Sequence, residues 1–377
     1  MALGSGSVNP ERFPDEVFDL YSIPAFDRGT PEVVAGKDIG STKQVVEPGD
    51  VLLSKIVPHI RRTWVVGPHR GRRIIASGEW IVFRGERIHP GYVRHVLVGD
   101  PFHAQFMRTV TGVGGSLLRA RPAHVAKIAI PLPSHQDQQR IADILDRADA
   151  LRAKRRAALA LLDALMQSIF VDMFGDVVVE TAAANIGDVA DVQGGLQVSH
   201  ARAPLPVEVP YLRVANVSRG ELLLDVIKTM RVTPAELERT ALRADDLLVV
   251  EGHGNPAELG RCALWRDAIT PCVHQNHLIR VRPRRTRVEP RYLHDFLNSP
   301  VGRRHLIRAG NTTSGLNTIS VADVRATPLI LPAMPRQVEY AHRMAAVDKL
   351  KAAHRVSLAQ LDALFASLQH RAFRGEL

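Results

Sequence analysis

Apolar residues recur at alternating steps of three and four positions through the middle of the chain. The pattern covers residues 130–176 and predicts one long helix, about 40 residues at ~1.5 Å rise each. Pro131 and Pro133 precede it, and Ser134 with Asp137 forms a predicted capping box at its start. The steps are those of a coiled-coil seam with one polar member. The expected seam residues are Ile141, Ile144, Ala148, Leu151, Arg155, Ala158, Leu162, Leu165 and Ile169.

A second copy of this helix is predicted at residues 329–373, at a constant offset of 199 positions. Helices rich in Ala and Leu resemble one another by chance, but a gap-free match at Pro, Gln and Asp positions favours duplication. If the copies pair antiparallel, Arg155 and His354 meet near the middle, and we expect both side chains to point outward to water. The matched positions include Pro133 and Pro332, Gln138 and Gln337, Asp149 and Asp348, and Leu162-Asp163-Ala164-Leu165 and Leu361-Asp362-Ala363-Leu364.

The segments before each helix alternate between short apolar runs and turn residues, which predicts two mixed α/β domains. In the first, strands are expected at 51–53, 63–66 and 79–84, and a helix at 90–97. The second domain repeats the framework residues of the first but not its loop residues. Asp246 corresponds to Asp50, and Tyr292 corresponds to Tyr92. The predicted order is therefore a domain at 11–129, a helix at 130–176, a domain at 177–328 and a helix at 329–377.

The net charge of +10 points to an acidic partner, and nucleic acid is the first to consider. Cys262 and Cys272 are too few for a zinc site or a disulfide framework, so we expect reduced packing residues in a cytoplasmic protein. No apolar run is expected to be long enough to span a membrane. The opening MALGSGS is interpreted as a flexible leader.

Motifs for catalysis are missing. The chain has no GxxxxGK[ST] phosphate loop and no Asn/Asp-Pro-Pro-aromatic tetrapeptide. A nuclease site could be attempted at Asp50 and Lys55, but Leu53 and Ser54 stand where a second carboxylate would be needed. His274 and His277 have an H-x-x-H spacing without a third ligand, so polar loop residues are the favoured interpretation over a metal site. We expect a protein with no catalytic residues and no metal.

Several phrases of the sequence resemble the specificity subunit of Type I restriction–modification systems, along nearly the whole chain. They are the two helical copies, EPGDVLLSKIVPHI in the first domain, and IGDVADVQGG, VPYLRVANV, LGRCALW and HQNHLIRVRP in the second. The resemblance implies an α+β fold with two mixed α/β target recognition domains, separated by two long helices that form an antiparallel coiled coil with a pseudo-two-fold internal repeat. The first domain lacks the IGDV opening found at Ile186, so its first strand is expected to be shorter or built differently.

The resemblance also implies partners. Each domain would bind one half of a bipartite double-stranded DNA target, with half-sites about one helical turn (~34 Å) apart. The helices would dock two modification subunits, which bring S-adenosylmethionine for adenine methylation. Restriction subunits, where present, would bring ATP and Mg²⁺ chemistry, and no cofactor would bind this chain itself. The alternatives are a stand-alone nuclease or methyltransferase, and a coiled-coil scaffold that binds no DNA.

Contacts to DNA are expected from Arg and Lys in loops, and from polar and Gly-rich loop tips that fit a groove. Arg72 is the residue for which we expect a phosphate contact, measurable as a salt dependence. In the first domain the candidates are Lys55, His59, Arg61, Arg62, Arg70, Arg72, Arg73, Gly115 and Ser116. In the second they are Arg202, Arg213, Asn216, His253, Asn255, Gln275, Asn276, Ser314 and Asn317. The candidates for docking partner subunits are Leu145, Leu159, Leu161, Met166, Phe170, Leu358 and Phe365.

Overall fold

The computed structural model describes residues 2–3, 6–112, 118–175, 183–310 and 317–377. The chain divides into two compact units. Unit 1 comprises residues 1–158 together with 354–377, and unit 2 comprises residues 159–353. Each unit therefore contains part of both long helices, which are α5 (His135–Phe174) and α11 (Met334–Ala372).

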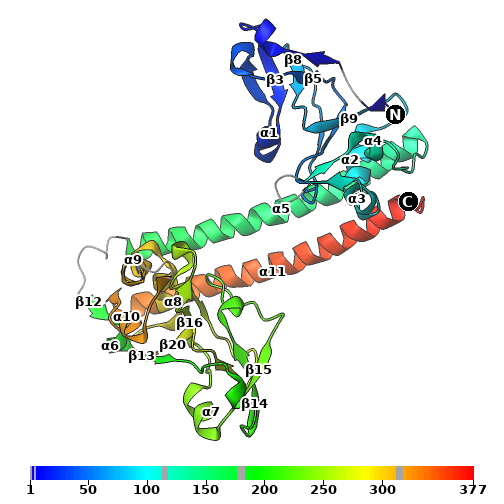
Figure 1. Ribbon diagram of the computed structural model, residues 1–377. Helices are drawn as coiled ribbons and strands as arrows, with labels where there is room; N and C mark the ends of the chain where they lie inside the picture. Colours follow the sequence, from blue (N-terminus) through cyan, green and yellow to red (C-terminus); the bar gives the residue numbers. More distant parts are fainter. Residues whose placement is uncertain (1, 4–5, 113–117, 176–182, 311–316) are drawn as a thin grey trace. The chain divides into compact units, whose positions relative to one another are not determined.

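Unit 1 is a mixed α/β fold (Figure 1). Its strands are β1 (Ala2–Leu3), β2 (Ser7–Val8), β3 (Val17–Tyr21), β4 (Glu32–Ala35), β5 (Lys43–Val45), β6 (Val51–Ser54), β7 (Thr63–Val65), β8 (Arg73–Ala76), β9 (Trp80–Arg84), β10 (Val110–Thr111) and β11 (Arg119–Ala120). Its helices, besides the ends of α5 and α11, are α1 (Ile23–Arg28), α2 (Pro90–Val98), α3 (Asp100–Met107) and α4 (Pro122–Val125), with 3-10 turns at Pro10–Arg12 and Gly36–Asp38. One sheet has the order β1-β9-β6-β7, a second has the order β2-β5-β8-β3-β4, and β10 pairs with β11.

The predicted strands at 51–53, 63–66 and 79–84 are present as β6, β7 and β9, and the helix at 90–97 as α2. The opening MALGSGS was expected to be a flexible leader, and this is wrong for its described residues. Ala2–Leu3 forms β1 against β9, and Ser7–Val8 forms β2 against β5, since backbone groups at a sheet edge accept any strand that can reach them. The first strand within 11–129 is β3, and at five residues it is as long as β13 of unit 2, so the expected shortening is wrong. The IGDV segment of unit 2 forms helix α6 before β13.

Unit 2 is also a mixed α/β fold. Its strands are β12 (Ala183–Asn185), β13 (Ala190–Gly194), β14 (Val207–Leu212), β15 (Lys228–Val232), β16 (Leu247–Val250), β17 (Gly252–His253), β18 (Cys262–Leu264), β19 (Val273–His274), β20 (Leu278–Pro283), β21 (Asn317–Thr318) and β22 (Pro328–Ile330). Its further helices are α6 (Ile186–Val189), α7 (Pro234–Thr240), α8 (Pro290–Asn298), α9 (Pro300–Ala309) and α10 (Val321–Arg325), with 3-10 turns at His200–Arg202, Val214–Asn216 and Pro256–Glu258. The sheets have the orders β13-β20-β16-β18 and β15-β14-β19, with the pairs β12-β22 and β17-β21.

The same hydrogen-bond framework occurs in both units. In unit 1, Asp50 accepts from the Glu47 amide and pairs with Arg84, and in unit 2 Asp246 accepts from the Arg243 amide and pairs with Arg282. These carboxylates are buried, so a charged partner is needed to offset the loss of water.

The entry to each long helix is also held in the same way. The Tyr92 hydroxyl donates to the Pro131 carbonyl at 3.0 Å, and the Tyr292 hydroxyl to the Ile330 carbonyl at 2.7 Å. The amide of His89 donates to Gln138 in unit 1. Gln337 accepts from the Glu289 amide in unit 2. The two units thus hold the entry to a long helix with the same residue types and the same hydrogen bonds.

Helix α5 begins at His135, after the predicted cap. The Asp137 amide donates to the Ser134 hydroxyl at 3.2 Å, as a capping box requires. The reciprocal bond differs from the expected one, because the Ser134 hydroxyl, and not its backbone amide, donates to the Asp137 carboxylate at 2.6 Å.

The seam predicted for α5 is partly wrong. Leu151 and Leu165 were expected inside it, but their side chains are exposed. At these two places the shielded side chain is the next one along the helix, Arg152 and Met166, whereas Arg155 and Leu162 between them are half-buried as predicted. The buried and half-buried positions of α5 include Ile141, Leu145, Ala148, Arg152, Arg155, Leu159, Leu162, Met166, Ile169 and Met173, and the predicted seam members Ile144 and Ala158 are half-buried too. Those of α11 include Tyr340, Met344, Val347, Lys351, His354, Leu358, Leu361, Phe365, Leu368 and Ala372, each 199 positions after its counterpart among the first ten.

These positions are where α5 and α11 pack in opposite chain directions. In unit 1, the start of α5 shares a core with the end of α11, through Ile141 and Leu145 on one side and Leu368 and Ala372 on the other. In unit 2 the pairing is reversed, and the end of α5 packs on the start of α11. Each unit is therefore closed by residues far away in the sequence.

Charged residues occupy the central positions of both helices. Arg155 Nη1 lies 3.1 Å from His354 Nδ1, so the expectation that both point away to water is wrong. Arg152 Nε lies 2.6 Å from Asp362 Oδ1 and its guanidinium lies over the Phe365 ring. The long aliphatic stems and planar heads fill the seam, and the carboxylate offsets part of the positive charge.

In unit 2, the corresponding lysine makes the corresponding contact. Lys351 lies 199 positions after Arg152, and its ammonium group lies 2.5 Å from the Asp163 carboxylate. Asp163 in turn precedes Asp362 by the same offset. Each unit therefore holds one of two equivalent cation–carboxylate pairs between the long helices.

Helix α11 is further fixed in unit 2 by a buried carboxylate. Tyr340 donates to Asp295 at 2.6 Å, and Arg291 Nε lies 2.6 Å from the same carboxylate. Burial alone would raise the pKa of Asp295, but the hydrogen bond and charge of His294, the charge of Arg291 and the hydrogen bond from Tyr340 lower it to about 2.

Removing the anchoring glutamine tests this framework. Gln138 is buried, accepts from the His89 amide at 2.8 Å, and donates to the Arg87 and Pro133 carbonyls at 3.0 Å each. We expect Gln138→Met to lower the free energy of unfolding by roughly 1–3 kcal/mol, because the buried Gln138 side chain is lost and three backbone groups lose their hydrogen-bond partner. Urea unfolding followed by tryptophan fluorescence measures this. The matched control is Gln139→Met at an exposed neighbour, and equal midpoints for the two variants would contradict the prediction.

Candidate nucleic-acid interface

Most cationic side chains predicted to contact DNA in unit 1 are engaged with carboxylates. These pairs are Lys55 with Glu79, Arg61 with Asp100, Arg62 with Asp27, Arg72 with Asp19, and Arg73 with Glu16. The sequence could not show this, because each partner is distant along the chain or on another element. A paired arginine has fewer donors to offer a phosphate.

The ion pair of Arg72 with Asp19 argues against the expected phosphate contact of Arg72. Its Nε lies 2.7 Å from Oδ1 of Asp19, whose side chain is buried in β3. Arg72 therefore serves the fold by neutralising a buried carboxylate. Arg70, in the same loop, is exposed and has no hydrogen bond or ion pair with a described residue. His59 is exposed too. Arg70 is thus the better candidate for a phosphate contact.

Several candidate DNA-binding residues of unit 2 also make hydrogen bonds or ion pairs within the unit. Asn216 is buried, accepts from the Arg213 amide at 3.1 Å, and donates to the Leu223 and Val226 carbonyls. Its side chain is therefore not available to a base. Arg202 makes a two-pronged ion pair with Glu236 and lowers the pKa of that carboxyl. Both residues hold turns in place.

Three further candidates of unit 2 are linked by local hydrogen bonds at His253. Asn317 is buried and its side chain donates to the His253 carbonyl, while His253 accepts from the Asn255 amide at 3.0 Å. Gln275 and Asn276 are half-buried and follow β19. Gly115, Ser116 and Ser314 lie outside the described residues.

A short ladder of residues lies at the loop end of β6 in unit 1. The Lys55 amide donates to the Glu79 carbonyl at 3.0 Å, and the Ala120 amide donates to the Lys55 carbonyl at 2.8 Å. Ile56 is bridged to Arg119. The side chains of Lys55 and Arg119 both reach Glu79, at 4.0 Å and 3.2 Å. We call Lys55, Glu79 and Arg119 the loop-end ladder of unit 1.

Unit 2 has the same backbone arrangement at the loop end of β16. The Glu251 amide donates to the His277 carbonyl at 3.1 Å, and the Ile319 amide donates to the Glu251 carbonyl at 2.8 Å. Gly252 pairs with Thr318. The Glu251 carboxylate lies 2.9 Å from His277 Nδ1. Glu251, His277 and Thr318 form the loop-end ladder of unit 2.

Sequence reasoning found Lys55 but missed the other ladder residues. A signal was present: the alignment of Asp50 with Asp246, continued by five positions, places Glu251 opposite Lys55. The two positions carry opposite charges on the same backbone.

The H-x-x-H pair does not form a metal site in the structure. His274 is buried in β19, whereas His277 is exposed and paired with Glu251. Within the described ranges, no cluster of three His, Cys, Asp or Glu side chains is placed to hold a metal ion. Cys262 and Cys272 are free and buried, as expected for packing residues, and burial raises the pKa of the Cys272 thiol to about 12.

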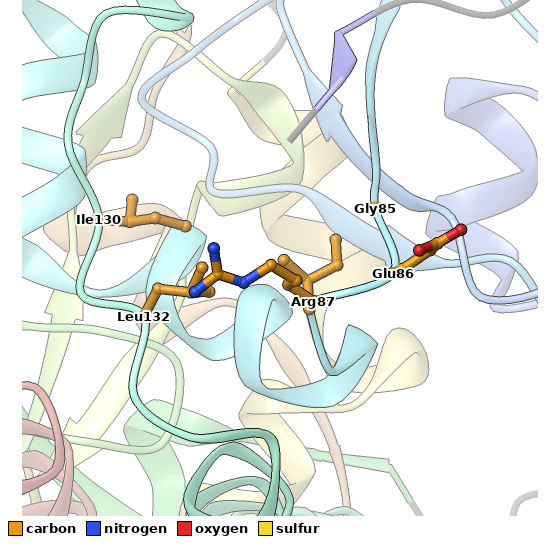
Figure 2. Close-up of a pocket in the computed structure, with 6 residues that line it drawn as sticks. Gly85, Glu86, Arg87, Ile130 and Leu132 are labelled. Carbon is orange, nitrogen blue, oxygen red and sulfur yellow. The ribbon is translucent and has the colours of Figure 1, made fainter.

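One shallow pocket lies in unit 1 just before α5. Its volume is about 360 Å³, and it is lined by Gly85, Glu86, Arg87, Ile88, Ile130 and Leu132. Figure 2 shows the Arg87 side chain extending toward Leu132, while Glu86 points away from it. None of the candidate DNA contacts lines this pocket. Its position next to the helix entry makes it part of the framework.

The apolar residues expected to dock partners divide into two groups. Leu145 is fully buried in the unit 1 core, and Phe365 packs against the same core. Met166 and Phe170 pack against the unit 2 core. These four close the units and do not offer a free surface. Leu161 is 72% exposed, and Leu159 and Leu358 are half-buried.

A different set of apolar side chains is exposed on the long helices. In unit 1, Leu151 of α5 and Leu364 of α11 are about half exposed, at 50% and 49%. In unit 2, the residues at the same offset, Leu350 and Leu165, are 53% and 44% exposed. Each unit thus presents an equivalent pair of leucines, one from each helix.

By length and composition alone, helix α5 is long and apolar enough to cross a membrane, although no such run was expected. A long helix of a soluble protein can pass the same test. Asp163 interrupts the apolar sequence of α5 and is paired with Lys351. Met166 and Phe170 pack against the unit 2 core. The helix therefore has protein contacts for one side and exposed leucines on another.

No family model matches the chain. It is 23% identical over 371 residues to the Type I restriction enzyme StySPI specificity subunit of Salmonella potsdam, a match covering 92% of this chain and 79% of that protein. It is 25% identical over 322 residues to the Type I restriction enzyme EcoKI specificity subunit of Escherichia coli strain K12, covering 78% and 68%. The resemblance to Type I specificity subunits is thereby confirmed.

Two solved structures share the fold. A chain from a study of complex assembly and conformational transition of the type I R-M system has a TM-score of 0.59 at 19% identity, covering 99% of this chain and 95% of that chain. The S subunit of a Type I restriction-modification system from M. genitalium has a TM-score of 0.54 at 10% identity, covering 99% and 93%.

Arg70 and Arg72 provide a matched test of the interface. We expect Arg70→Ala to leave the free energy of unfolding unchanged and to reduce the slope of log K against log salt by about 0.9, because one phosphate contact is lost. Arg72→Ala should instead lower the free energy of unfolding by roughly 1–3 kcal/mol, since Asp19 loses its partner. Urea unfolding and DNA binding at several salt concentrations measure both. A stable Arg72→Ala variant with a reduced salt slope would restore Arg72 as the phosphate contact.

Burial of His274 predicts a pH dependence of folding. Burial, with the nearby charge of Arg280, lowers the pKa of His274 from 6.5 to about 4. Between these pH values the unfolded chain binds a proton that the folded chain does not, so the free energy of unfolding should fall as the pH drops from about 6.5 to 4. His274→Leu should flatten this dependence in urea unfolding at successive pH values. An unchanged profile would mean that His274 takes up its proton without unfolding.

Proposed function

We propose, from the similarity to Type I specificity subunits, that this chain is the DNA sequence-specificity subunit of a Type I restriction–modification complex. Each unit binds one half of a bipartite double-stranded DNA target. The observation that carries the proposal is the match to the StySPI specificity subunit over 92% of the chain. The chain itself provides recognition and assembly, and the chemistry belongs to its partners.

The two units share one framework, which supports the proposal that each unit binds a DNA half-site. Both units carry the same Asp–Arg pair, the same Tyr-to-carbonyl bond and the same glutamine anchor. Their loop side chains differ. Buried framework groups decide the fold of a unit, whereas loop groups decide what it binds, so twin frameworks with different loops suit two different half-sites.

The long helices act in this proposal as an antiparallel coiled coil that sets the distance between half-sites. Its supporting observations are the shielded positions at steps of three and four in both helices, and the contacts that run in opposite directions. Half-sites about one helical turn (~34 Å) apart are the expected target.

The helices also dock two modification subunits. The proposed docking patch of each unit contains one equivalent pair of exposed leucines, Leu151 with Leu364 in unit 1 and Leu350 with Leu165 in unit 2. Two equivalent patches suit two copies of one partner, since identical subunits need identical surfaces. We add Leu161 of α5, which is 72% exposed, to the proposed patch of unit 2.

Catalysis and cofactors belong to the partners. The modification subunits bring S-adenosylmethionine for adenine methylation, and two restriction subunits, where the system has them, bring ATP and Mg²⁺ chemistry. This chain holds no cofactor and works in the cytoplasm with its DNA. A stand-alone nuclease is disfavoured because Asp50, the carboxylate at which such a site could be attempted, is buried and bound to Arg84. A stand-alone methyltransferase is disfavoured because the sequence has no Asn/Asp-Pro-Pro-aromatic tetrapeptide. A scaffold without DNA binding gives no reason for two divergent sets of loops.

Exchanging one recognition unit tests the division of labour. We expect replacement of residues 11–129 by the equivalent segment of another specificity subunit to change one half of the methylated sequence and to leave the other half and the spacing unchanged. Sequencing of methylated adenines in cells that express the complex measures this. If the methylated sequence stays the same throughout, the recognition role is refuted.

Adding charge to the exposed apolar patch tests the docking surface. We expect the double variant Leu161→Glu/Leu165→Glu to weaken assembly with the modification subunit by roughly tenfold or more, because two leucines no longer leave water on binding. The control is Gln167→Glu, an exposed position of the same helix. Isothermal titration of the purified subunits gives both affinities. Equal affinities would show that the partner docks elsewhere.

A further inference from the structure

The two loop-end ladders are the place where the units keep one backbone but reverse their charges. Lys55 and Glu251 occupy the same position in the backbone. The Lys55 amide donates to the Glu79 carbonyl, and its carbonyl accepts from the Ala120 amide. The Glu251 amide donates to the His277 carbonyl, and its carbonyl accepts from the Ile319 amide. One is a cation and the other an anion. Across the ladder, Glu79 stands where unit 2 has His277.

Framework pairs of the same sheets do not show this reversal. The ion pairs Asp50 with Arg84 and Asp246 with Arg282 have the same charges in both units. Each aspartate immediately precedes β6 or β16, and each arginine lies in β9 or β20. A group that only stabilises the sheet has no reason to change sign while its neighbours and its backbone bonds stay the same. A group that binds different partners in the two units has such a reason.

We propose that the loop-end ladders are base-reading elements: Lys55 and Arg119 of unit 1 donate to the major-groove acceptors of a guanine, and Glu251 of unit 2 accepts from the exocyclic amino group of a cytosine or adenine. This rests on the proposed function and specifies it further. The major groove presents these donors and acceptors in patterns that differ for each base pair.

Unit 1 has more donors than its own acceptors can use. Glu79 is the one carboxylate shared by Lys55 and Arg119, at 4.0 Å and 3.2 Å. The Arg119 side chain is 62% exposed, and Lys55 and Glu79 are about a quarter exposed, at 26% and 29%. Glu79 therefore holds the two cations near one another, and both side chains keep an exposed part, the larger on Arg119. A donor held in position loses less side-chain entropy when it binds a guanine.

Unit 2 presents the opposite chemistry at the same location. Thr318 stands in place of Arg119, which removes one cation. Glu251 accepts from His277 through Oε2, and its side chain remains 30% exposed. A carboxylate can accept further hydrogen bonds, and amino groups of cytosine or adenine are the donors that bases offer in the major groove.

Transfer of one ladder to the other unit tests the proposal. The variant Lys55→Glu/Glu79→His/Arg119→Thr gives unit 1 the ladder of unit 2. The full complex with its modification subunits is incubated with S-adenosylmethionine and a DNA library randomised in both half-sites, and methylated molecules are sequenced. In the half-site read by unit 1, we expect the preference for one guanine to fall by roughly tenfold. A new preference for cytosine or adenine, whose amino group can donate to the introduced carboxylate, is expected at that position. The other half-site and the spacing stay the same.

Two further variants keep the result interpretable. The control Arg28→Glu/Glu32→Arg reverses an exposed ion pair on the same unit and should leave every preference unchanged. Lys55→Met alone removes one donor with little change of shape and should reduce the same guanine preference. This single variant replaces the triple variant in the test if the triple variant does not fold. Urea unfolding shows that each variant is folded.

The outcomes are distinct. Loss of overall methylation without any change of base preference would overturn the proposal, because the ladder would then supply affinity for the DNA backbone only. Unchanged methylation by the triple variant would overturn it as well. In either case a bipartite sequence methylated by the unaltered complex leaves the proposed function standing. If the unaltered complex shows no bipartite sequence, the proposed function itself fails.

Discussion

Both units depend on the contact between two helices that are distant in the sequence. The core of unit 1 contains Ile141 and Leu145 from α5 together with Ala372 from α11, and the core of unit 2 contains Met173 and Phe174 from α5 together with Tyr340 from α11. Neither unit can bury its apolar surface from one continuous stretch of chain. The helices are therefore required for the fold of the units as well as for any role as a spacer, and changes in their seam should be felt by both.

The centre of this seam is polar, which needs a physical account. Apolar residues would have contributed more to stability, because a charged group loses water there. The structure offsets this cost with the Arg152–Asp362 and Lys351–Asp163 pairs and with the stacking of Arg152 on Phe365. Polar groups inside a helix pair favour the one alignment in which they all find partners. Here that alignment also brings Arg155 next to His354.

The sequence predicted those parts of the fold that depend on local pattern. The long helices, the cap at Ser134, the strands around Val51 and the shared position of Tyr92 and Tyr292 all follow from periodicity and turn residues. The seam was misassigned in its middle because Arg152 and Lys351 carry long stems that substitute for apolar side chains, whereas Leu151 and Leu165 are exposed. No hydrophobic pattern distinguishes these cases.

The candidate site was harder to predict, since charge alone does not show what a charge is paired with. Arg72 looked like a free loop cation, and only the fold places the buried Asp19 against it. Asn216 looked like a base reader, yet it holds its own turn. Comparison of the two units within one chain was more informative, because equal backbone bonds at Lys55 and Glu251 make their difference in charge meaningful.

The central claim is that one chain reads two separate DNA half-sites. Its most direct test is the map of methylated adenines in DNA from cells that express this chain with its modification subunit. The account predicts two short specific sequences separated by a non-specific spacer of constant length, with half-site centres about one helical turn apart. Methylation at a single continuous sequence, or methylation that does not depend on this chain, would contradict it.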